Sequence, residues 1–327
     1  MNIYKFIEIT VRVGHLRRFR SCVLKVVFPG ILIMLATATL FAQKSAPEGK
    51  PFGSPDAAVD AFVAAAEAYD LGAMMEILGP NSRDLVQTGE QAYDRDILTE
   101  FAKLARDKKS ITFAKRNRNM AMLAIGPDDW PFPIPMVKRG ANWYFDTAAG
   151  REEVFYRRIG NNELDAIDIS RGYVDAQHQY ALKKHDGALV NQYAQRVIST
   201  PGKHDGLAWQ NADGTWGGTV GERAAKALEK SYTGQRAPFH GYYFQILTKQ
   251  GKAAPLGEMD YVQKDAMIGG FALIAYPAIY QVTGVKTFMI SHDGVVYEKD
   301  LGPQTPDIAP RIERFDPDKT WSPVLAN

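Results

Sequence analysis

The spacing of apolar residues changes twice along the chain, and this change constrains the fold more than any other feature of the sequence. Between residues 54 and 108 apolar side chains recur every three or four positions, as in Val59, Phe62 and Ala66, which is typical of helices that bury one face. Between 110 and 145 short apolar runs broken by Asn, Gly, Pro and charge indicate strands. A helical stretch at 148–184 and strands between 242 and 299 repeat this order. The pattern predicts an α+β protein of two domains, each with helices packed on an antiparallel sheet.

The first domain is predicted to span residues 54–160. Ser54, Pro55 and Asp56 have the residue types of a helix N-cap, first turn and positive helix end, so a helix is expected to begin there. Further helices are expected at 72–78 and 93–108, followed by strands at 111–114, 120–125, 132–137 and 143–145. Three helices followed by a strand meander resemble the α+β roll of nuclear-transport-factor-like domains.

The second domain is predicted to span residues 161–327. Gly160 and Gly172 each cost a helix about 1 kcal/mol relative to Ala, so the helical stretch is expected to break at 160–162, where the domains meet. Residues 188–236 are rich in glycine and are interpreted as long loops around a short helix at 221–230. Strands are expected at 242–248, 267–276, 285–291 and 295–299.

An apolar run near the N-terminus indicates export. Six basic residues and one acid, Glu8, lie within the first 42 residues, and the uncharged run Val26–Ala42 ends in the small residue Ala42 followed by polar Gln43. This order is typical of a secretory signal, so residues 1–42 are interpreted as a signal peptide cleaved after Ala42, with a linker at 43–53. A run of 17 residues is close to the length of a spanning helix, so an uncleaved anchor remains the alternative. After cleavage no stable membrane span is expected.

The single cysteine and the charge balance exclude several classes of protein. Cys22 precedes the apolar run, so the mature chain would contain no disulfide, no thiol nucleophile and no thiolate metal site. Without the six basic residues and Glu8 of the first 42 positions, the totals of 39 basic and 37 acidic residues become 33 and 36. A weakly acidic chain lacks the positive surface of a nucleic-acid-binding protein. The predicted location is the periplasm or the cell surface of a bacterium.

Several segments carry a family resemblance. Residues 199–209 (STPGKHDGLAW), 241–248 (GYYFQILT), 267–277 (MIGGFALIAYP) and 283–302 (TGVKTFMISHDGVVYEKDLG) resemble the bacterial family called domain of unknown function 2950. The resemblance begins near Phe52 and implies an exported envelope protein, without catalytic residues that could be assigned here. The helix and strands of the second half also resemble the heads of type IV pilin-like proteins, although the pilin sequence Phe-Thr-Leu-Ile-Glu is absent.

Motifs of well-marked enzyme classes are absent. The sequence lacks G-x-S-x-G, H-E-x-x-H, both glycine-rich phosphate-binding motifs and an EF-hand loop. His-Asp-Gly occurs three times, at 185–187, 204–206 and 292–294. A histidine beside an aspartate could supply a base and its orienting carboxylate or two metal ligands, but adjacent residues in a turn usually point apart. His292 and Asp293 are the first choice for a catalytic pair, whereas the simpler interpretation makes residues 292–294 a hairpin turn. No metal site and no cofactor are predicted.

Aromatic residues in the second half suggest a binding surface instead. Trp209, Tyr242 and Tyr243 are the candidate binding residues, because such rings can stack sugars or peptide side chains, although they could equally belong to the core. The leading hypothesis is a non-catalytic binding or assembly factor whose partner is an envelope protein or a small ligand. The alternative is an exported hydrolase that uses a His-Asp pair. Convergence of at least two of His185, His204, His240 and His292 with a carboxylate in one pocket would favour the enzyme.

Overall fold

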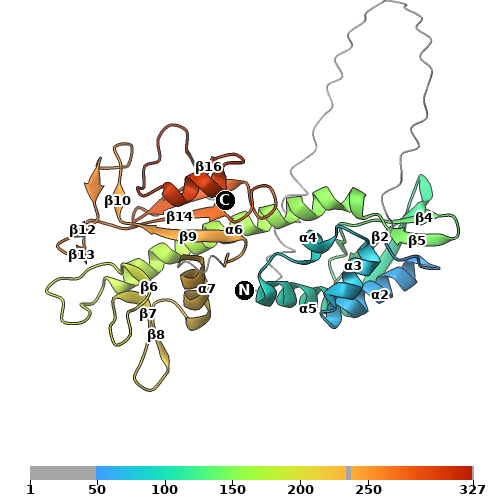
Figure 1. Ribbon diagram of the computed structural model, residues 1–327, viewed down its shortest axis with the longest axis horizontal. Coiled ribbons are helices and arrows are strands. Elements are labelled where there is room, and N and C mark those ends of the chain that lie inside the picture. The colour runs from blue at the N-terminus through green and yellow to red at the C-terminus, as the bar shows by residue number, and fades with distance from the viewer. Residues whose placement is uncertain (1–48, 233–236, 326–327) are drawn as a thin grey trace, which may run out of the picture. The chain divides into compact units, whose positions relative to one another are not determined.

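The structure is a computed structural model that describes residues 49–232 and 237–325. The predicted signal peptide and residues 43–48 of the predicted linker lie outside the described residues. In the part of the chain that is described, no helix is both long enough and apolar enough to cross a membrane. Helices and strands carry the labels of Figure 1.

The chain forms two compact units. Unit 1 contains the described residues up to Val86 and Ile97–Gly150, and unit 2 contains Gln87–Asp96 and the chain from Arg151 onward. The apolar pattern predicts the boundary slightly later, at 160, with residues 87–96 in the first domain. In the structure this short segment belongs to unit 2, where Glu90 accepts hydrogen bonds from two main-chain amides. Each unit combines helices with antiparallel strands, so the protein is α+β as predicted.

Unit 1 begins with a helix that starts where the sequence predicts. Ser54 Oγ accepts from Ala57 N at 3.1 Å, and the helix α2 (Pro55–Glu67) starts with proline at its first position. Asp70 caps α3 (Leu71–Leu78) in the same way, through its Oδ1 and Ala73 N at 2.9 Å. Two more helices follow, α4 (Arg83–Val86) and α5 (Gln91–Asp107), of which α5 starts in unit 2 and continues into unit 1.

The helices of unit 1 cover an antiparallel sheet with the strand order β1-β2-β4-β5, in which β3 pairs with β2. The strands are β1 (Lys109–Ala114), β2 (Asn117–Ile125), β3 (Trp130–Pro131), β4 (Met136–Arg139) and β5 (Asn142–Phe145). Phe62 of α2 contacts Phe132 and Phe145, with ring centroids 5.4 and 5.3 Å apart. These buried rings join the helical layer to the sheet.

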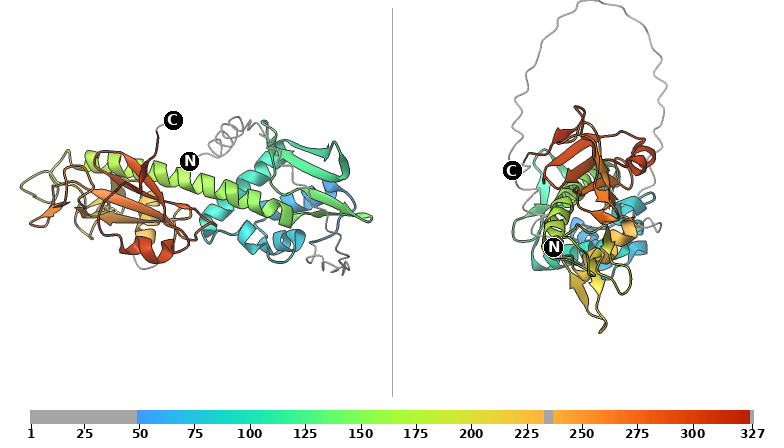
Figure 2. Two further views of the ribbon diagram at one scale, coloured as in Figure 1. Left: turned by 90° about the horizontal axis from the view of Figure 1, so that it is seen from above. Right: turned by 90° about the vertical axis from the view of Figure 1, so that its left-hand side faces the viewer.

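The helix α6 (Thr147–Tyr180) is continuous, which corrects the break predicted at residues 160–162. Figure 2 shows it as one long unbroken helix. Asn162 Nδ2 donates to Thr283 O at 2.8 Å, and Glu163 Oε1 accepts from Val285 N at 2.9 Å. Both bonds tie the helix to a segment more than 120 residues away. These contacts offset the helix-weakening effect of Gly160, and the sequence pattern does not reveal them.

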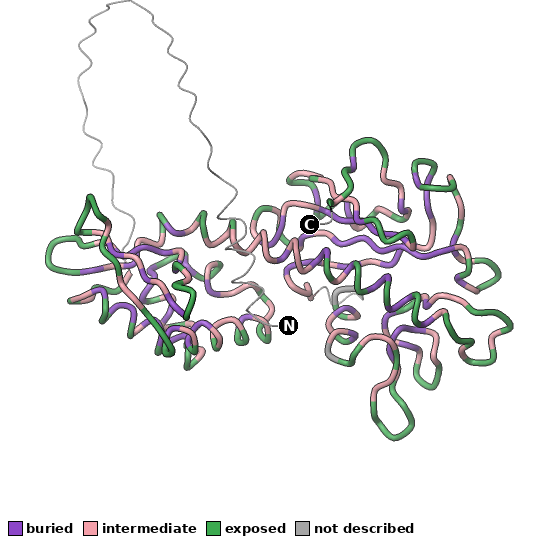
Figure 3. The backbone as a smooth tube through the Cα atoms, turned by 180° about the vertical axis from the view of Figure 1, so that it is seen from behind, coloured by how far each residue is buried: buried purple, intermediate pink, exposed green. Residues whose placement is uncertain are grey.

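The core of unit 2 is a five-stranded antiparallel sheet with the order β17-β16-β15-β14-β9. Its strands are β9 (Tyr242–Leu247), β14 (Ala272–Pro277), β15 (Lys286–Ser291), β16 (Val296–Asp300) and β17 (Ser322–Pro323). Tyr173 of α6 contacts Phe271 next to β14, with ring centroids 5.6 Å apart, so α6 packs against this sheet. Figure 3 shows the central strands as a buried band among exposed loops. The helix α8 (Thr305–Ile308) and the 3-10 helix η1 (Ala309–Arg311) follow β16.

Residues 188–232 contain a small sheet where the sequence predicts loops. Its strands are β6 (Arg196–Ile198), β7 (Gly206–Gln210) and β8 (Trp216–Gly218), with β6 parallel to β7 and β8 antiparallel to it. Strands of three to five residues, two of which contain glycine, are too short for a period of two to stand out. The helix α7 (Glu222–Tyr232) follows close to the predicted position. Two short hairpins complete unit 2, one of β10 (Lys249–Gln250) and β11 (Met259–Asp260), the other of β12 (Val262–Gln263) and β13 (Ala266–Met267).

Candidate functional site

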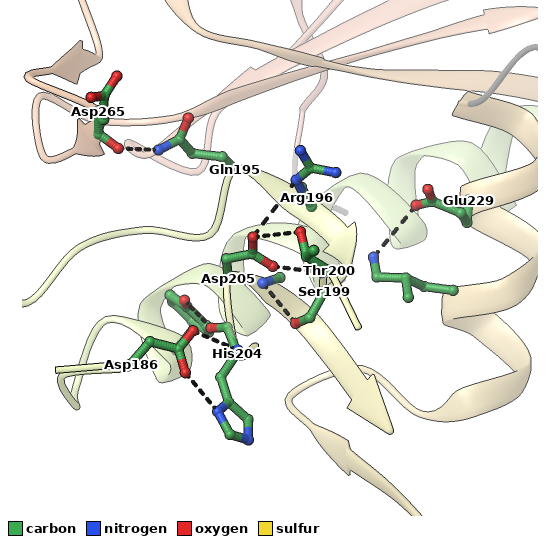
Figure 4. A network of polar contacts seen from close by, with 12 residues as sticks. Asp186, Gln195, Arg196, Ser199, Thr200, His204, Asp205, Glu229 and Asp265 are labelled. Atoms are coloured by element: carbon green, nitrogen blue, oxygen red, sulfur yellow. Dashed lines mark hydrogen bonds and ion pairs between the residues drawn. The ribbon is translucent and has the colours of Figure 1, made fainter. Parts of the chain in front are cut away.

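Two of the three His-Asp-Gly motifs come together in unit 2, and each supplies one half of a hydrogen-bonded pair. His204 Nδ1 lies 2.9 Å from Asp186 Oδ1, and the main-chain N–H of His204 donates to Asp186 Oδ2 at 2.6 Å (Figure 4). The histidine of one motif therefore pairs with the aspartate of the other. The side chains are 44% and 35% exposed, so the pair is accessible from solvent.

The end of α6 positions the aspartate of this pair. His185 Nε2 lies 3.0 Å from Tyr180 O, at the last residue of the helix. Asp186 and Gly187 then adopt φ angles of 51° and 73°, which turn the chain back toward His204. Tyr180 Oη donates to His204 O at 2.5 Å. One helix terminus thus holds both halves of the pair.

The loop that carries His204 is held by its own polar contacts. Asp205 accepts from Thr200 N at 2.7 Å and from Thr200 Oγ1 at 2.8 Å. Arg196 Nε lies 3.9 Å from Asp205 Oδ2. Figure 4 shows these contacts where β6 and β7 lie side by side. Because the loop is already ordered, a ligand that contacts His204 would lose little affinity to ordering it.

Trp209, on β7, lies at the centre of the group. Its cross-strand neighbour is Gly217, where a Cβ would lie 2.7 Å from the indole Nε1, so glycine gives the indole its place beside β8. The ring of His204 meets the indole edge to face, with centroids 4.7 Å apart, and the ring of His185 lies 5.8 Å away. His185 also stacks on Tyr180 at 4.0 Å.

We call Tyr180, His185, Asp186, His204 and Trp209 the Trp209 surface. It carries one ionised carboxylate. The main-chain N–H of His204 is the largest cause that lowers the pKa of Asp186, which therefore stays ionised at neutral pH. Burial, with smaller contributions from the charges of Asp186 and Asp205, raises the pKa of Tyr180 to about 12. An anionic group placed beside Asp186 would be repelled by its carboxylate.

A second carboxylate–histidine pair lies in unit 2. His240 Nδ1 is 2.8 Å from Asp165 Oδ2, and these side chains are only 14% and 21% exposed. Glu90 accepts from the main-chain N–H groups of His240 and Gly241 at 2.9 and 2.6 Å. The ring of Tyr93 lies 4.8 Å from the imidazole of His240. This pair is assembled from three segments that are far apart in the sequence.

The surroundings of the second pair shift two further pKa values upward. Burial is the largest cause that raises the pKa of Glu90, although the amides of Gly241 and His240 oppose it. Burial also raises the pKa of Tyr93, and the charges of Asp165 and Glu90 add to the effect. The phenol of Tyr93 therefore stays protonated at neutral pH and can donate a hydrogen bond.

Residues 292–294 form the hairpin turn between β15 and β16. Gly294 has a φ of 78°, and its N–H donates to Ser291 O at 3.0 Å. Asp293 Oδ1 accepts from Ser291 Oγ at 2.9 Å and from Val295 N at 3.1 Å. The carboxylate of the motif is therefore used to shape the turn.

The imidazole of His292 faces away from this carboxylate network. Its ring lies 6.1 Å from that of Tyr261 and 6.2 Å from that of Phe271, between centroids. His292 Nδ1 is buried and makes no hydrogen bond. The structure therefore does not bring His292 and Asp293 together as a base and its orienting carboxylate.

The three aromatic binding candidates occupy different environments. Trp209 is part of the Trp209 surface described above. Tyr242 is completely buried, and its Oη donates to Lys286 O at 2.9 Å, so this ring has no face for a ligand. Tyr243 is half-buried and its ring lies 5.6 Å from that of Tyr276 on β14.

The convergence that would favour an enzyme occurs in part. His185 and His204 meet at Trp209 beside Asp186, whereas His240 and His292 each lie in other surroundings. Within the ranges that the structure describes, no group of three or more His, Cys, Asp or Glu side chains could hold a metal ion. The repeated motif signalled Asp186 and His204, but nothing in the sequence signalled Asp165 or Glu90.

The comparisons with known proteins identify a family. Residues 49–324 match the family described as "Protein of unknown function (DUF2950)", and the chain belongs to this family. The resemblance to this family seen in the sequence is therefore confirmed. No curated protein and no solved structure matches the chain.

Proposed function

We propose that this member of the DUF2950 family is an exported bacterial envelope protein that binds a ligand or partner without catalysing a reaction. The observation that carries the proposal is the convergence of two histidines and Asp186 on the half-buried Trp209. Aromatic rings bordered by a few fixed polar groups are typical of binding sites. The polar contacts that hold the His204 loop favour binding, because they remove most of the cost of ordering it.

Export to the periplasm or cell surface is supported by the basic, apolar and small-residue order of residues 1–42. We expect mass spectrometry of the exported protein to find an N-terminus at Gln43. A chain that retains residues 1–42 would favour a membrane anchor instead.

The binding function can be tested with a matched pair of tryptophan variants. The mature chain, Trp209→Ala and Trp216→Ala would be immobilised and exposed to envelope extract of the source bacterium. Trp216 is the control, because it lies on the neighbouring strand and contacts Lys226, with Nζ 5.0 Å from the ring centroid. We expect the wild type and Trp216→Ala to retain the same component and Trp209→Ala to lose it. Equal retention by all three, or none by the wild type, would refute the proposal.

The second candidate function is an exported hydrolase. The Asp165–His240 pair favours it, because a carboxylate that holds Nδ1 leaves Nε2 free to take a proton from water or an alcohol. Tyr93 beside the ring could donate a hydrogen bond to the substrate. The Asp186–His204 pair has the same bond but is far more exposed.

The hydrolase can be tested with chromogenic ester and glycoside substrates. We expect any activity to be lost in His240→Gln and kept in His204→Gln, with melting temperatures recorded for both. A wild type without activity, or an activity that survives in His240→Gln, rules this candidate out.

We also propose finer fold relationships for the two units. The order of helices followed by a β1-β2-β4-β5 sheet supports a nuclear-transport-factor-like roll for unit 1. A long helix followed by an antiparallel sheet supports a pilin-head-like arrangement for unit 2. Superposition of an experimental structure of each unit on those folds would test both.

A further inference from the structure

Both histidines of the Trp209 surface have one ring nitrogen bound to a group that only accepts hydrogen bonds. His185 Nε2 lies 3.0 Å from the main-chain oxygen of Tyr180, and His204 Nδ1 lies 2.9 Å from the carboxylate of Asp186. A carbonyl and an ionised carboxylate cannot donate, so each of these nitrogens must carry the proton. In the neutral rings, the lone pairs are therefore on His185 Nδ1 and His204 Nε2.

The two imidazoles that carry these lone pairs border one aromatic ring. Both imidazoles contact the indole of Trp209, at centroid distances of 5.8 and 4.7 Å. His185 is stacked on Tyr180, and His204 is held by Asp186 through its side chain and its main chain, so neither ring rotates freely. The surface thus presents an apolar ring with two oriented hydrogen-bond acceptors.

The charges around the indole restrict the ligand further. Asp186 is ionised, and Asp205 lies on the same loop as His204, with Arg196 as its counterion at 3.9 Å. The Asp186 carboxylate is hydrogen-bonded to the His204 ring, so it lies beside the place where a ligand would meet that ring. A carboxylate or phosphate of the ligand at this place would be repelled by it.

We propose that the Trp209 surface binds a neutral saccharide, with the sugar ring stacked on the indole and its hydroxyls donating to His185 Nδ1 and His204 Nε2. This inference rests on the proposed binding function and names its ligand class. A pyranose ring has an apolar C–H face for the indole and hydroxyl donors around its edge, so it satisfies both features at once. An aliphatic or phenyl side chain of a peptide would occupy the indole, but it has no donors for the two histidines.

The binding test uses four probes and the intrinsic fluorescence of the mature chain together with calorimetry. Cellohexaose, chitohexaose and maltohexaose are neutral oligosaccharides, and a hexamer of galacturonic acid is the anionic counterpart. We expect at least one neutral hexamer to bind with a dissociation constant below about 10 mM, and the anionic hexamer to bind about tenfold more weakly or not at all. Failure of all three neutral hexamers, or equal binding of the anionic one, would overturn the inference.

Variants locate the site and test the role of the acceptors. Trp209→Ala should weaken binding about tenfold, and Trp216→Ala should leave it unchanged. Asp186→Asn should weaken it about fivefold, because its amide can donate to His204 Nδ1 and so move the proton to Nε2. The ¹⁵N shifts of the His204 ring report this move without ligand. A wild-type protein with the proton on Nε2, or saccharide binding that Trp209→Ala leaves intact, would contradict the assignment.

The two proposals can fail separately. If envelope extract yields a component that Trp209→Ala loses, but no neutral hexamer binds or displaces it, the saccharide assignment is wrong while the binding function stands. This would be the outcome if the retained component were a protein or a peptide. If neither experiment shows a difference at Trp209, both proposals fail.

Discussion

The two carboxylate–histidine pairs of unit 2 contain the same hydrogen bond in different surroundings. The Nδ1 to carboxylate distance is 2.9 Å in Asp186–His204 and 2.8 Å in Asp165–His240. The histidine of the first pair is 44% exposed and that of the second 14%. The first joins residues 18 positions apart, and the second joins residues 75 positions apart with Glu90 as a third partner.

The difference in exposure determines what each pair contributes to stability and to ligand binding. An exposed ionic pair adds little to stability, because water solvates each partner nearly as well when the pair is broken. The exposed pair therefore orients a ring for a ligand at small energetic cost. In the half-buried pair, the loss of one partner leaves the other without a hydrogen bond, and the free energy of unfolding falls more. The half-buried pair thus joins distant segments of unit 2, and any catalytic role would build on this framework.

The largest effect is expected at the glycine next to His240. A Cβ on Gly241 would lie 2.4 Å from Asn162 Nδ2 and 3.0 Å from Thr283 Cβ, at a φ of 74°. Gly241→Ala should lower the free energy of unfolding by about 3 kcal/mol, measured by urea denaturation. Gly202, in the His204 loop, is the control, since its φ is 79° but no atom lies within 4 Å of its Cβ position. Gly202→Ala should cost about 1 kcal/mol, and equal losses would contradict this account.

The next largest difference in stability is expected between the alanine variants of His240 and His204. His240→Ala removes a half-buried ring and leaves Asp165 without its partner, so the free energy of unfolding should fall by about 2 kcal/mol. His204→Ala breaks an exposed pair and should cost less than about 1 kcal/mol. Chemical denaturation of both variants measures the difference. A larger loss for His204→Ala would reverse the comparison.

His292 lies outside both pairs and provides a reference for the stability lost when a histidine side chain is removed. As a residue in a surface turn, His292 would be expected to tolerate alanine within about 0.5 kcal/mol. Its ring contacts Tyr261 and Phe271, so we expect His292→Ala to cost about 1 kcal/mol through lost packing. Its buried Nδ1 has no hydrogen bond to lose. Thermal melting decides between the two values.

The smallest effects are expected in the pH dependence of stability, with opposite signs at the two pairs. The pKa of Glu90 is raised above 4.5 in the folded state. Its contribution to the free energy of unfolding is therefore fully present below pH 4.5 and is lost as the pH rises through the folded pKa. The pKa of Asp186 is lowered below 3.8, so its contribution is present above pH 3.8 and is lost as the pH falls through the folded pKa.

Variants that cannot titrate at these positions measure both signs. The melting temperature of the wild type minus that of Glu90→Gln should decrease as the pH rises from 4.5 toward neutrality. The corresponding difference for Asp186→Asn should decrease as the pH falls below 3.8. The same sign at both positions would show that the two environments do not differ as described.

Local chemistry made part of the fold predictable. Ser54 caps the first helix, and Gly294 provides the positive φ of the hairpin turn, because both roles depend only on residues a few positions away. The five longest helices and most strands of four or more residues were predicted from local patterns, together with the α+β class. The continuity of α6 was not predicted, because Asn162 and Glu163 hold the helix through bonds to residues more than 120 positions away.

The family, the order of the longer elements and the repeated His-Asp-Gly motif can be read from the sequence alone. The pairing of His204 with Asp186, the contact of Asp165 with His240 and the role of Asp293 in its own turn become visible only in the folded chain. The cause is the distance along the sequence over which each contact acts. Caps, turns and periodicity are encoded in neighbouring residues, whereas the partner of a side chain depends on which distant segments packing brings within about 3 Å.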